Sequence, residues 1–181
     1  MDAVGYDLYC KMLNEAVKLL KGEIEEETYT TTIDLEVDAF IPPSYIPNEY
    51  QKLDVYKRIS GIETEEEKED MLEELIDRYG DVPRKVQQLL EIALLKAQAH
   101  RLYVTAIEQK GEEYRFAMYE KAKVCVERIP ELIAKYHGEL QFKTEASCFV
   151  YKKIGKNKAE KEESPISIVK NILNDINILI E

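Results

Sequence analysis

The sequence Gly80-Asp81-Val82-Pro83 separates two amphipathic segments and constrains the fold more than any other stretch of the chain. A glycine can adopt the positive φ angle that ends a helix, an aspartate can cap the next helix, and a proline suits a first helical turn. Apolar residues recur at helical spacing on both sides of this corner. The pattern predicts two helices joined by a tight turn, with the apolar faces Met71, Leu72, Leu75, Ile76 and Tyr79 before it and Val86, Leu90, Ala93, Leu94 and Ala97 after it.

The helix before the corner is strongly acidic. Between Glu63 and Asp77 there are nine acidic residues, and Lys68 is the one basic residue. Helical spacing places Asp70, Glu74 and Asp77 on the side opposite the apolar face. The chain carries a net charge of −11, and residues 23–81 hold 19 acidic and 5 basic side chains. Such a surface repels nucleic acid and attracts basic protein surfaces, so direct nucleic-acid binding is not expected.

The changing periodicity along the chain predicts an α+β fold over residues 1–181, with 45% hydrophobic residues to build its core. Residues 1–103 are expected to form a mainly helical part with one or two strands. Residues 104–152 are expected to form a small antiparallel strand-strand-helix-strand-strand lobe. A mobile loop over residues 153–163 and a terminal helix over residues 164–181 complete the expected single domain.

Local patterns predict the elements of the helical part. An amphipathic helix is expected from Tyr6 to Leu20, and the alternation of Ile33, Leu35 and Val37 predicts a strand. Three prolines then predict an extended connector. The next helix is expected over Glu49–Ser60, capped by Asn48, with Leu53, Tyr56 and Ile59 on its inner face, and Thr64 with Glu67 forms a capping box for the acidic helix.

After Val104 the apolar period changes from 3.6 to 2. The pattern predicts one hairpin from Val104–Gln109 and Tyr114–Met118, and a second from Glu139–Lys143 and Ser147–Lys152. A helix is expected between them over Val124–Tyr136, although Pro130 argues against a regular middle. Ser164 and Pro165 are expected to start the last helix, with an apolar stripe of Ile166, Val169, Leu173, Ile176 and Ile180.

The sequence lacks the motifs of the common enzyme classes. There is no phosphate-binding GxxxxGK[ST] loop, no HExxH metal motif and no GxSxG nucleophile elbow, so neither catalysis nor a cofactor is expected. The three cysteines, Cys10, Cys125 and Cys148, show no paired spacing and are expected to be free thiols in a reducing cytosol. Without a secretion signal or a long apolar run, the protein is expected to be soluble and cytoplasmic.

The acidic helix is the one candidate site, and its chemistry leaves three functions open. The carboxylates can form a solvated face, a divalent-metal site of a metal-dependent hydrolase, or the docking surface of an acidic protein-binding module. In the third case Glu74 and Asp77, three residues apart, can accept arginine side chains. A separate alternative is DNA contact through the basic residues Lys152, Lys153, Lys156 and Lys158.

Four blocks of sequence, in order, resemble the C-terminal domain of the bacterial transcription-repair coupling factors over roughly residues 4–105. They are VGYDLYCKMLNEAV, the strand with IPPSYIPN, YKRISGI, and ELIDRYGDVP with LLEIALLKAQA. The resemblance implies a fragment of a large cytoplasmic protein whose ATP-dependent DNA translocase module pushes stalled RNA polymerase forward. It also implies that this domain is an appended, non-catalytic module.

The resemblance further implies an autoinhibitory role. In the family, this domain packs on an N-terminal repair-protein-like domain of the same chain and masks the surface that recruits the repair protein UvrA. UvrA and RNA polymerase would therefore be indirect partners through the longer protein. The acidic side chains that face the basic N-terminal domain correspond to Glu74 and Asp77 here, with Asp70 as a third candidate.

Overall fold

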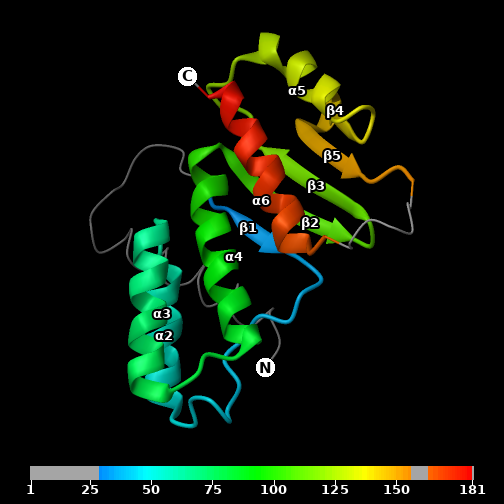
Figure 1. Ribbon diagram of the computed structural model, residues 1–181. Helices are drawn as coiled ribbons and strands as arrows, with labels where there is room; N and C mark the ends of the chain where they lie inside the picture. The colour runs from blue at the N-terminus through cyan, green and yellow to red at the C-terminus, as the bar shows by residue number, and fades with distance from the viewer. Residues whose placement is uncertain (1–28, 156–162, 181) are drawn as a thin grey trace. The chain divides into compact units, whose positions relative to one another are not determined.

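The computed structural model describes residues 29–155 and 163–180. The helix expected over Tyr6–Leu20 lies outside the described residues, as does most of the expected loop at 153–163. The described chain forms two compact units. Of the described residues, the helical unit contains 29–30 and 37–97, and the sheet unit contains 31–36, 98–155 and 163–180. The mixture of helices and a five-stranded sheet confirms the α+β class (Figure 1).

The helical unit contains α2 (Glu49–Ser60), α3 (Glu65–Tyr79) and most of α4 (Arg84–Arg101). The expected N-terminal caps of α2 and α3 are confirmed. The side chain of Asn48 accepts a hydrogen bond from the Gln51 amide, and Thr64 and Glu67 form the reciprocal capping box. Each cap pairs backbone amides that the first helical turn leaves without an intrahelical acceptor.

The glycine of the corner between α3 and α4 has the expected positive φ angle, but its ψ angle of −160° lies outside the left-handed helical region. Gly80 has a φ angle of +84°, and its amide donates to the carbonyl oxygen of Ile76. Pro83 immediately precedes α4, and its carbonyl oxygen accepts the amide of Gln87 at 3.0 Å. The proline thus lies where a missing N–H costs no intrahelical bond.

The predicted inner face of α2 is wrong in one position. Leu53 is 45% exposed, whereas Val55 and Ile59 are fully buried and Lys52 is only 8% exposed. The buried face of α2 thus consists of Lys52, Val55 and Ile59, and Lys52 is accommodated because it buries its aliphatic stem while its ammonium reaches Glu49 at 3.2 Å. The apolar face of α3 also differs from the prediction, since Met71 and Leu75 are buried but Ile76 is half exposed.

The buried surface of α4 is wider than the single predicted face. Val86, Leu90, Ala93 and Leu94 are buried as expected, whereas Ala97 is only half-buried. The residues Leu89, Ile92, Leu95 and Ala99 are buried as well. A helix that is apolar on nearly all sides belongs inside a fold and not on its surface.

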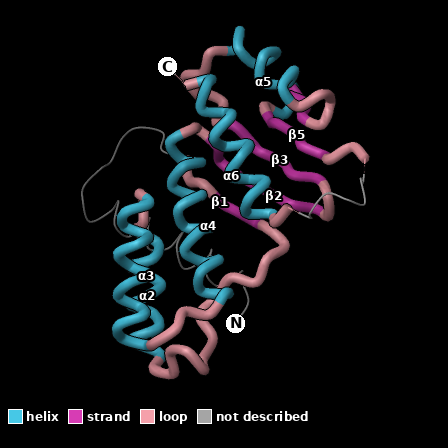
Figure 2. The backbone as a smooth tube through the Cα atoms, in the orientation of Figure 1, coloured by secondary structure: helices cyan, strands magenta, loops and turns pink. Residues whose placement is uncertain are grey.

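The sheet unit is built on five strands in the order β1-β2-β3-β5-β4 (Figure 2). The strands are β1 (Thr32–Asp34), β2 (Val104–Lys110), β3 (Glu113–Met118), β4 (Leu140–Lys143) and β5 (Cys148–Lys152). Both predicted hairpins are therefore present, and β3 pairs with β5 to join them. Unlike the other pairs, β1 and β2 run parallel.

The two faces of the sheet differ in polarity. One row across the sheet consists of Ile33, Ile107, Phe116, Phe149 and Phe142, of which all but Phe142 are fully buried. The next residues along the strands point to the opposite face and include the exposed Asp34, Glu108 and Arg115. This alternation is typical of a sheet with one face packed and one face solvated.

The helix expected over Val124–Tyr136 is shorter and irregular at its start. A 3₁₀ turn over Val126–Arg128 leads into α5 (Ile129–Lys135), in which Pro130 occupies the first turn and not the middle. The last helix, α6 (Pro165–Ile176), begins as predicted with Ser164 accepting the Ser167 amide. A final 3₁₀ turn, η3, follows over Asn177–Leu179.

Candidate functional site

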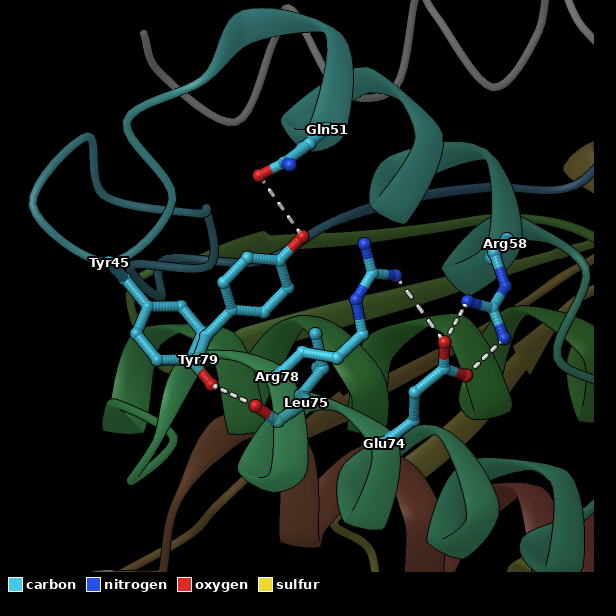
Figure 3. Close-up of polar contacts among 7 residues, drawn as sticks. All are labelled: Tyr45, Gln51, Arg58, Glu74, Leu75, Arg78 and Tyr79. Carbon is cyan, nitrogen blue, oxygen red and sulfur yellow. Dashed lines mark hydrogen bonds and ion pairs between the residues drawn. The ribbon is translucent and has the colours of Figure 1, made fainter.

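The three predicted site residues lie on α3, but in two different environments. Asp70 and Asp77 are exposed, and the structure gives neither carboxylate a partner among the described residues. Glu74 is half-buried and lies between two arginines (Figure 3). The structure therefore leaves Asp70 and Asp77 open to a partner, whereas Glu74 already has one.

Both oxygens of the Glu74 carboxylate are bound by Arg58 of α2, one by each terminal nitrogen of the guanidinium. Arg78, one turn further along α3, contributes a longer contact of 3.4 Å to Oε1. The side chains of Arg58 and Arg78 are both 42% exposed and that of Glu74 is 34% exposed. The hydrogen bonds from Arg58 hold the pKa of Glu74 below its ordinary value. A bidentate pair of this kind has a defined geometry, but its exposure to solvent limits its free energy.

Aromatic contacts fix the end of α3 next to this network. The Arg78 guanidinium lies 5.1 Å from the ring centroid of Tyr79, whose ring in turn lies 5.8 Å from that of Tyr45. The Tyr45 hydroxyl contacts the carbonyl oxygens of Leu75 at 3.1 Å and Gly80 at 3.0 Å. Tyr45 thereby ties the proline-rich segment to the last turn of α3, where backbone carbonyls lack intrahelical donors (Figure 3).

Four of the exposed carboxylates of α3 form a continuous row. Glu66, Asp70, Glu73 and Asp77 follow one another at intervals of four, three and four residues, and all four are exposed. We call these four residues the acidic stripe. Within the described part of the chain, none of the four carboxylates has an ion-pair or hydrogen-bond partner. Their spacing places them on one side of the helix, so their negative potentials add.

Two members of the acidic stripe, Glu66 and Glu73, were not among the predicted site residues. The signal that identifies them is the helical spacing from Asp70 and Asp77, which the sequence contains. The arginine partner of Glu74 was also missed, because Arg58 belongs to a different helix.

A second ion-pair network lies on another side of α3. Lys68 binds Glu65 on its own helix and lies 2.8 Å from Glu91 of α4. Burial works to lower the pKa of Lys68, but the hydrogen bonds to the two carboxylates outweigh it and leave the pKa raised. Its side chain is only 12% exposed. The one basic residue of the acidic segment thus joins two helices and does not shield the acidic stripe.

The described residues do not bring the other candidates from the sequence together in one site. Among residues 29–155 and 163–180, no three His, Cys, Asp or Glu side chains gather in a way that could hold a metal ion. Cys125 and Cys148 are free thiols, and Cys10 lies outside the described residues. Of the four lysines considered for DNA contact, Lys152 is exposed and Lys153 half-buried, while Lys156 and Lys158 lie outside the described residues.

His100, at the end of α4, is exposed, and its Nδ1 lies 3.2 Å from the Thr31 hydroxyl. Thr31 itself donates to the carbonyl oxygen of Val104 at 2.7 Å, which fastens the residue before β1 to the start of β2. The contact therefore belongs to the packing of the sheet unit.

In the described part of the chain, no helix has the length and apolar character needed to cross a membrane.

The fold and the site together define a mixed α+β domain with an exposed acidic helix. Its fold is that of a solved C-terminal domain of a transcription-repair coupling factor, with a TM-score of 0.65 and 22% sequence identity. The similarity covers 83% of this chain and 94% of that one.

The model of the TRCF domain family matches residues 35–129, so the chain belongs to the TRCF domain family. It is 39% identical over 128 residues to the transcription-repair-coupling factor of Bacillus subtilis and 41% identical over 124 residues to that of Staphylococcus haemolyticus. These matches cover 70% and 67% of this chain. The chain spans 11% of the length of either relative. The resemblance of residues 4–105 to these proteins is thus confirmed at the level of the family.

Proposed function

We propose that this chain is a non-catalytic regulatory domain of a transcription-repair coupling factor. The acidic side of α3 docks on a basic surface of the N-terminal domain of the same protein. In the docked state it masks the surface that recruits UvrA, and the contact opens when the protein engages stalled RNA polymerase. Asp77 and Asp70 are the docking carboxylates, and Glu74 joins them when its own arginines release it.

The acidic stripe is the observation that carries this proposal. Four exposed carboxylates that have no partner among the described residues repel one another on one helix face, and a basic surface relieves that repulsion. Membership of the TRCF domain family supports an intramolecular partner, because the chain spans only 11% of the length of the relatives it matches.

A charged interface suits a contact that must open again. Charge complementarity contributes more to orientation and rate of association than to affinity, and salt screens it. A coupling free energy of about 1–3 kcal/mol between docking and polymerase engagement is sufficient to shift the two populations.

The test uses the full-length protein that carries this domain. Asp70→Lys and Asp77→Lys, alone and together, are expected to raise basal ATP hydrolysis and UvrA binding, because they place like charges across the interface. Glu145→Lys is the matched control, since it reverses an exposed carboxylate of the sheet unit, on the turn between β4 and β5. The isolated domain with either change is expected to remain folded.

Unchanged ATP hydrolysis and unchanged UvrA binding in the double variant would remove the docking role from the acidic stripe. An equal rise in the Glu145→Lys control would show a general charge effect and would also overturn the proposal. A direct readout is binding of this domain to the N-terminal domain supplied in trans, which is expected to weaken as salt concentration rises.

A further inference from the structure

The Glu74 carboxylate lies beside the acidic stripe without belonging to it. It follows Asp70 by four residues and precedes Asp77 by three, so it lies about one helical turn from each of them on the surface of α3. Arg58 occupies both of its oxygens and Arg78 contacts one of them. The two guanidinium groups therefore supply positive charge next to the stripe from inside the same unit.

We propose that Arg58 and Arg78 are built-in competitors that hold Glu74 away from the docking partner, so that Glu74 joins the docked contact only when one guanidinium is exchanged for another. This inference rests on the proposed function, because it concerns the regulation of the same surface. The exchange leaves the number of charge-assisted hydrogen bonds to Glu74 unchanged and alters only which guanidinium donates them.

The exposure of the pair makes the exchange feasible. Breaking a buried ion pair leaves an unsolvated charge and is strongly unfavourable, whereas an exposed pair contributes little. The side chains of Arg58 and Glu74 are 42% and 34% exposed, so water can solvate each during the exchange. The contact is thus stable enough to define one geometry and weak enough to be replaced.

The helix that carries Arg58 also provides an alternative acceptor. Asp54 precedes Arg58 by four residues on α2, and its negative charge acts on the Arg58 guanidinium in the present structure. An acidic residue four positions before a basic one is the favourable orientation for a pair on a helix. When the partner takes Glu74, Arg58 can therefore pair with Asp54.

Arg78 has a contact besides the one with Glu74. Its guanidinium lies over the Tyr79 ring, and Tyr79 contacts both Tyr45 and Gln51. Its contact to Glu74 is 3.4 Å, longer than a typical charge-assisted hydrogen bond. Arg58 therefore contributes most of the competition, and its removal is the sharper test.

The experiment measures binding of the full 181-residue chain to the N-terminal domain of the same protein, supplied in trans at low salt. Arg58→Gln frees Glu74 and is expected to tighten binding about two- to fivefold, the range that an exposed ion pair can supply. Lys57→Gln is the matched control. It removes the same charge from the adjacent exposed position of α2, and Lys57 has no bond to Glu74.

A second pair of variants separates competition from general charge. In a Glu74→Gln background, Arg58→Gln is expected to change binding no more than Lys57→Gln does, because the contested carboxylate is gone. Equal effects of Arg58→Gln and Lys57→Gln on binding in the wild-type background would overturn the proposal that Arg58 competes for Glu74. Thermal unfolding of each variant checks that the α2–α3 pair is intact.

The outcomes distinguish this inference from the proposed function. If Asp77→Lys abolishes binding but Arg58→Gln does not tighten it beyond the control, docking stands and competition is wrong. If Asp70→Lys and Asp77→Lys leave binding unchanged, the proposed docking itself is wrong, and the inference is overturned with it.

Discussion

Lys68 of α3 and Glu91 of α4 form an ion pair of 2.8 Å that joins the two helices on either side of the corner. The Lys68 side chain is 12% exposed, and it also binds Glu65. The pair gives the α3–α4 connection a polar contact in addition to its apolar seam, so the angle of the acidic helix does not depend on hydrophobic packing alone.

Removing the Lys68 ammonium is expected to destabilise the helical unit. Lys68→Met keeps the aliphatic stem but leaves Glu91 without its partner, and we expect a loss of about 1–2 kcal/mol in the free energy of unfolding. Lys57→Met, at an exposed position of α2, is the control and is expected to change the free energy by less than about 0.5 kcal/mol. Urea unfolding followed by circular dichroism measures both, and equal losses would contradict the assignment.

The corner glycine provides a second test. Gly80 has a φ angle of +84°, where a side chain is strained even though no atom lies within 4 Å of the added Cβ. Gly80→Ala is therefore expected to cost about 1–2 kcal/mol through backbone strain alone. Gly61→Ala is the matched control, because Gly61 ends α2 with a φ angle of −87° and its Cβ would meet Arg58 O at an ordinary 3.5 Å. The control is expected to be neutral or stabilising.

The burial pattern of α2 predicts an asymmetry between neighbouring apolar residues. Val55 is fully buried and Leu53 is 45% exposed. We expect Val55→Ala to cost about 2 kcal/mol, whereas Leu53→Ala, which removes more atoms, is expected to cost less than about 1 kcal/mol. Thermal unfolding of the two variants checks the order. A larger loss for Leu53→Ala would support the inner face predicted from sequence periodicity instead.

The sheet unit is expected to lose stability in alkali. Burial and a hydrogen bond to Asp175 raise the pKa of Tyr136, and burial raises the pKa of Tyr151 to about 12. An unfolded tyrosine releases its proton near pH 10, so the stabilisation is complete below pH 10 and declines as the pH rises above it. Tyr136→Phe is expected to reduce that decline, and Tyr50→Phe, at a residue that is 85% exposed, is not. Unfolding free energies at pH 8, 10 and 11 distinguish the two.

Local features of the fold could be predicted because they depend on neighbouring residues. The caps at Asn48, Thr64 and Ser164 each satisfy amides within three residues, so their sequence signals are sufficient. Family membership could be predicted for a similar reason, since it rests on contiguous blocks of residues.

Long-range features could not be predicted in the same way. The pairing of Arg58 with Glu74 requires that α2 and α3 lie side by side, which periodicity alone does not determine. Exposed Asp77 and paired Glu74 look equivalent in the sequence, and only the position of Arg58 distinguishes them. The parallel pairing of β1 with β2 was also missed, because the two strands are far apart in the sequence. The hydrogen bond from Thr31 to the Val104 carbonyl, for example, spans 73 residues of chain.

That parallel pairing places β1, which precedes α2 in the chain, beside β2 in the sheet unit. The chain leaves the sheet after β1, forms α2, α3 and most of α4, and returns at β2. A truncation that starts at Gln98 would therefore remove an edge strand and expose the edge of β2 to pairing with other chains. A peptide containing Thr31–Glu36 would supply the missing strand in trans, so the sheet unit is suited to strand complementation and not to simple dissection.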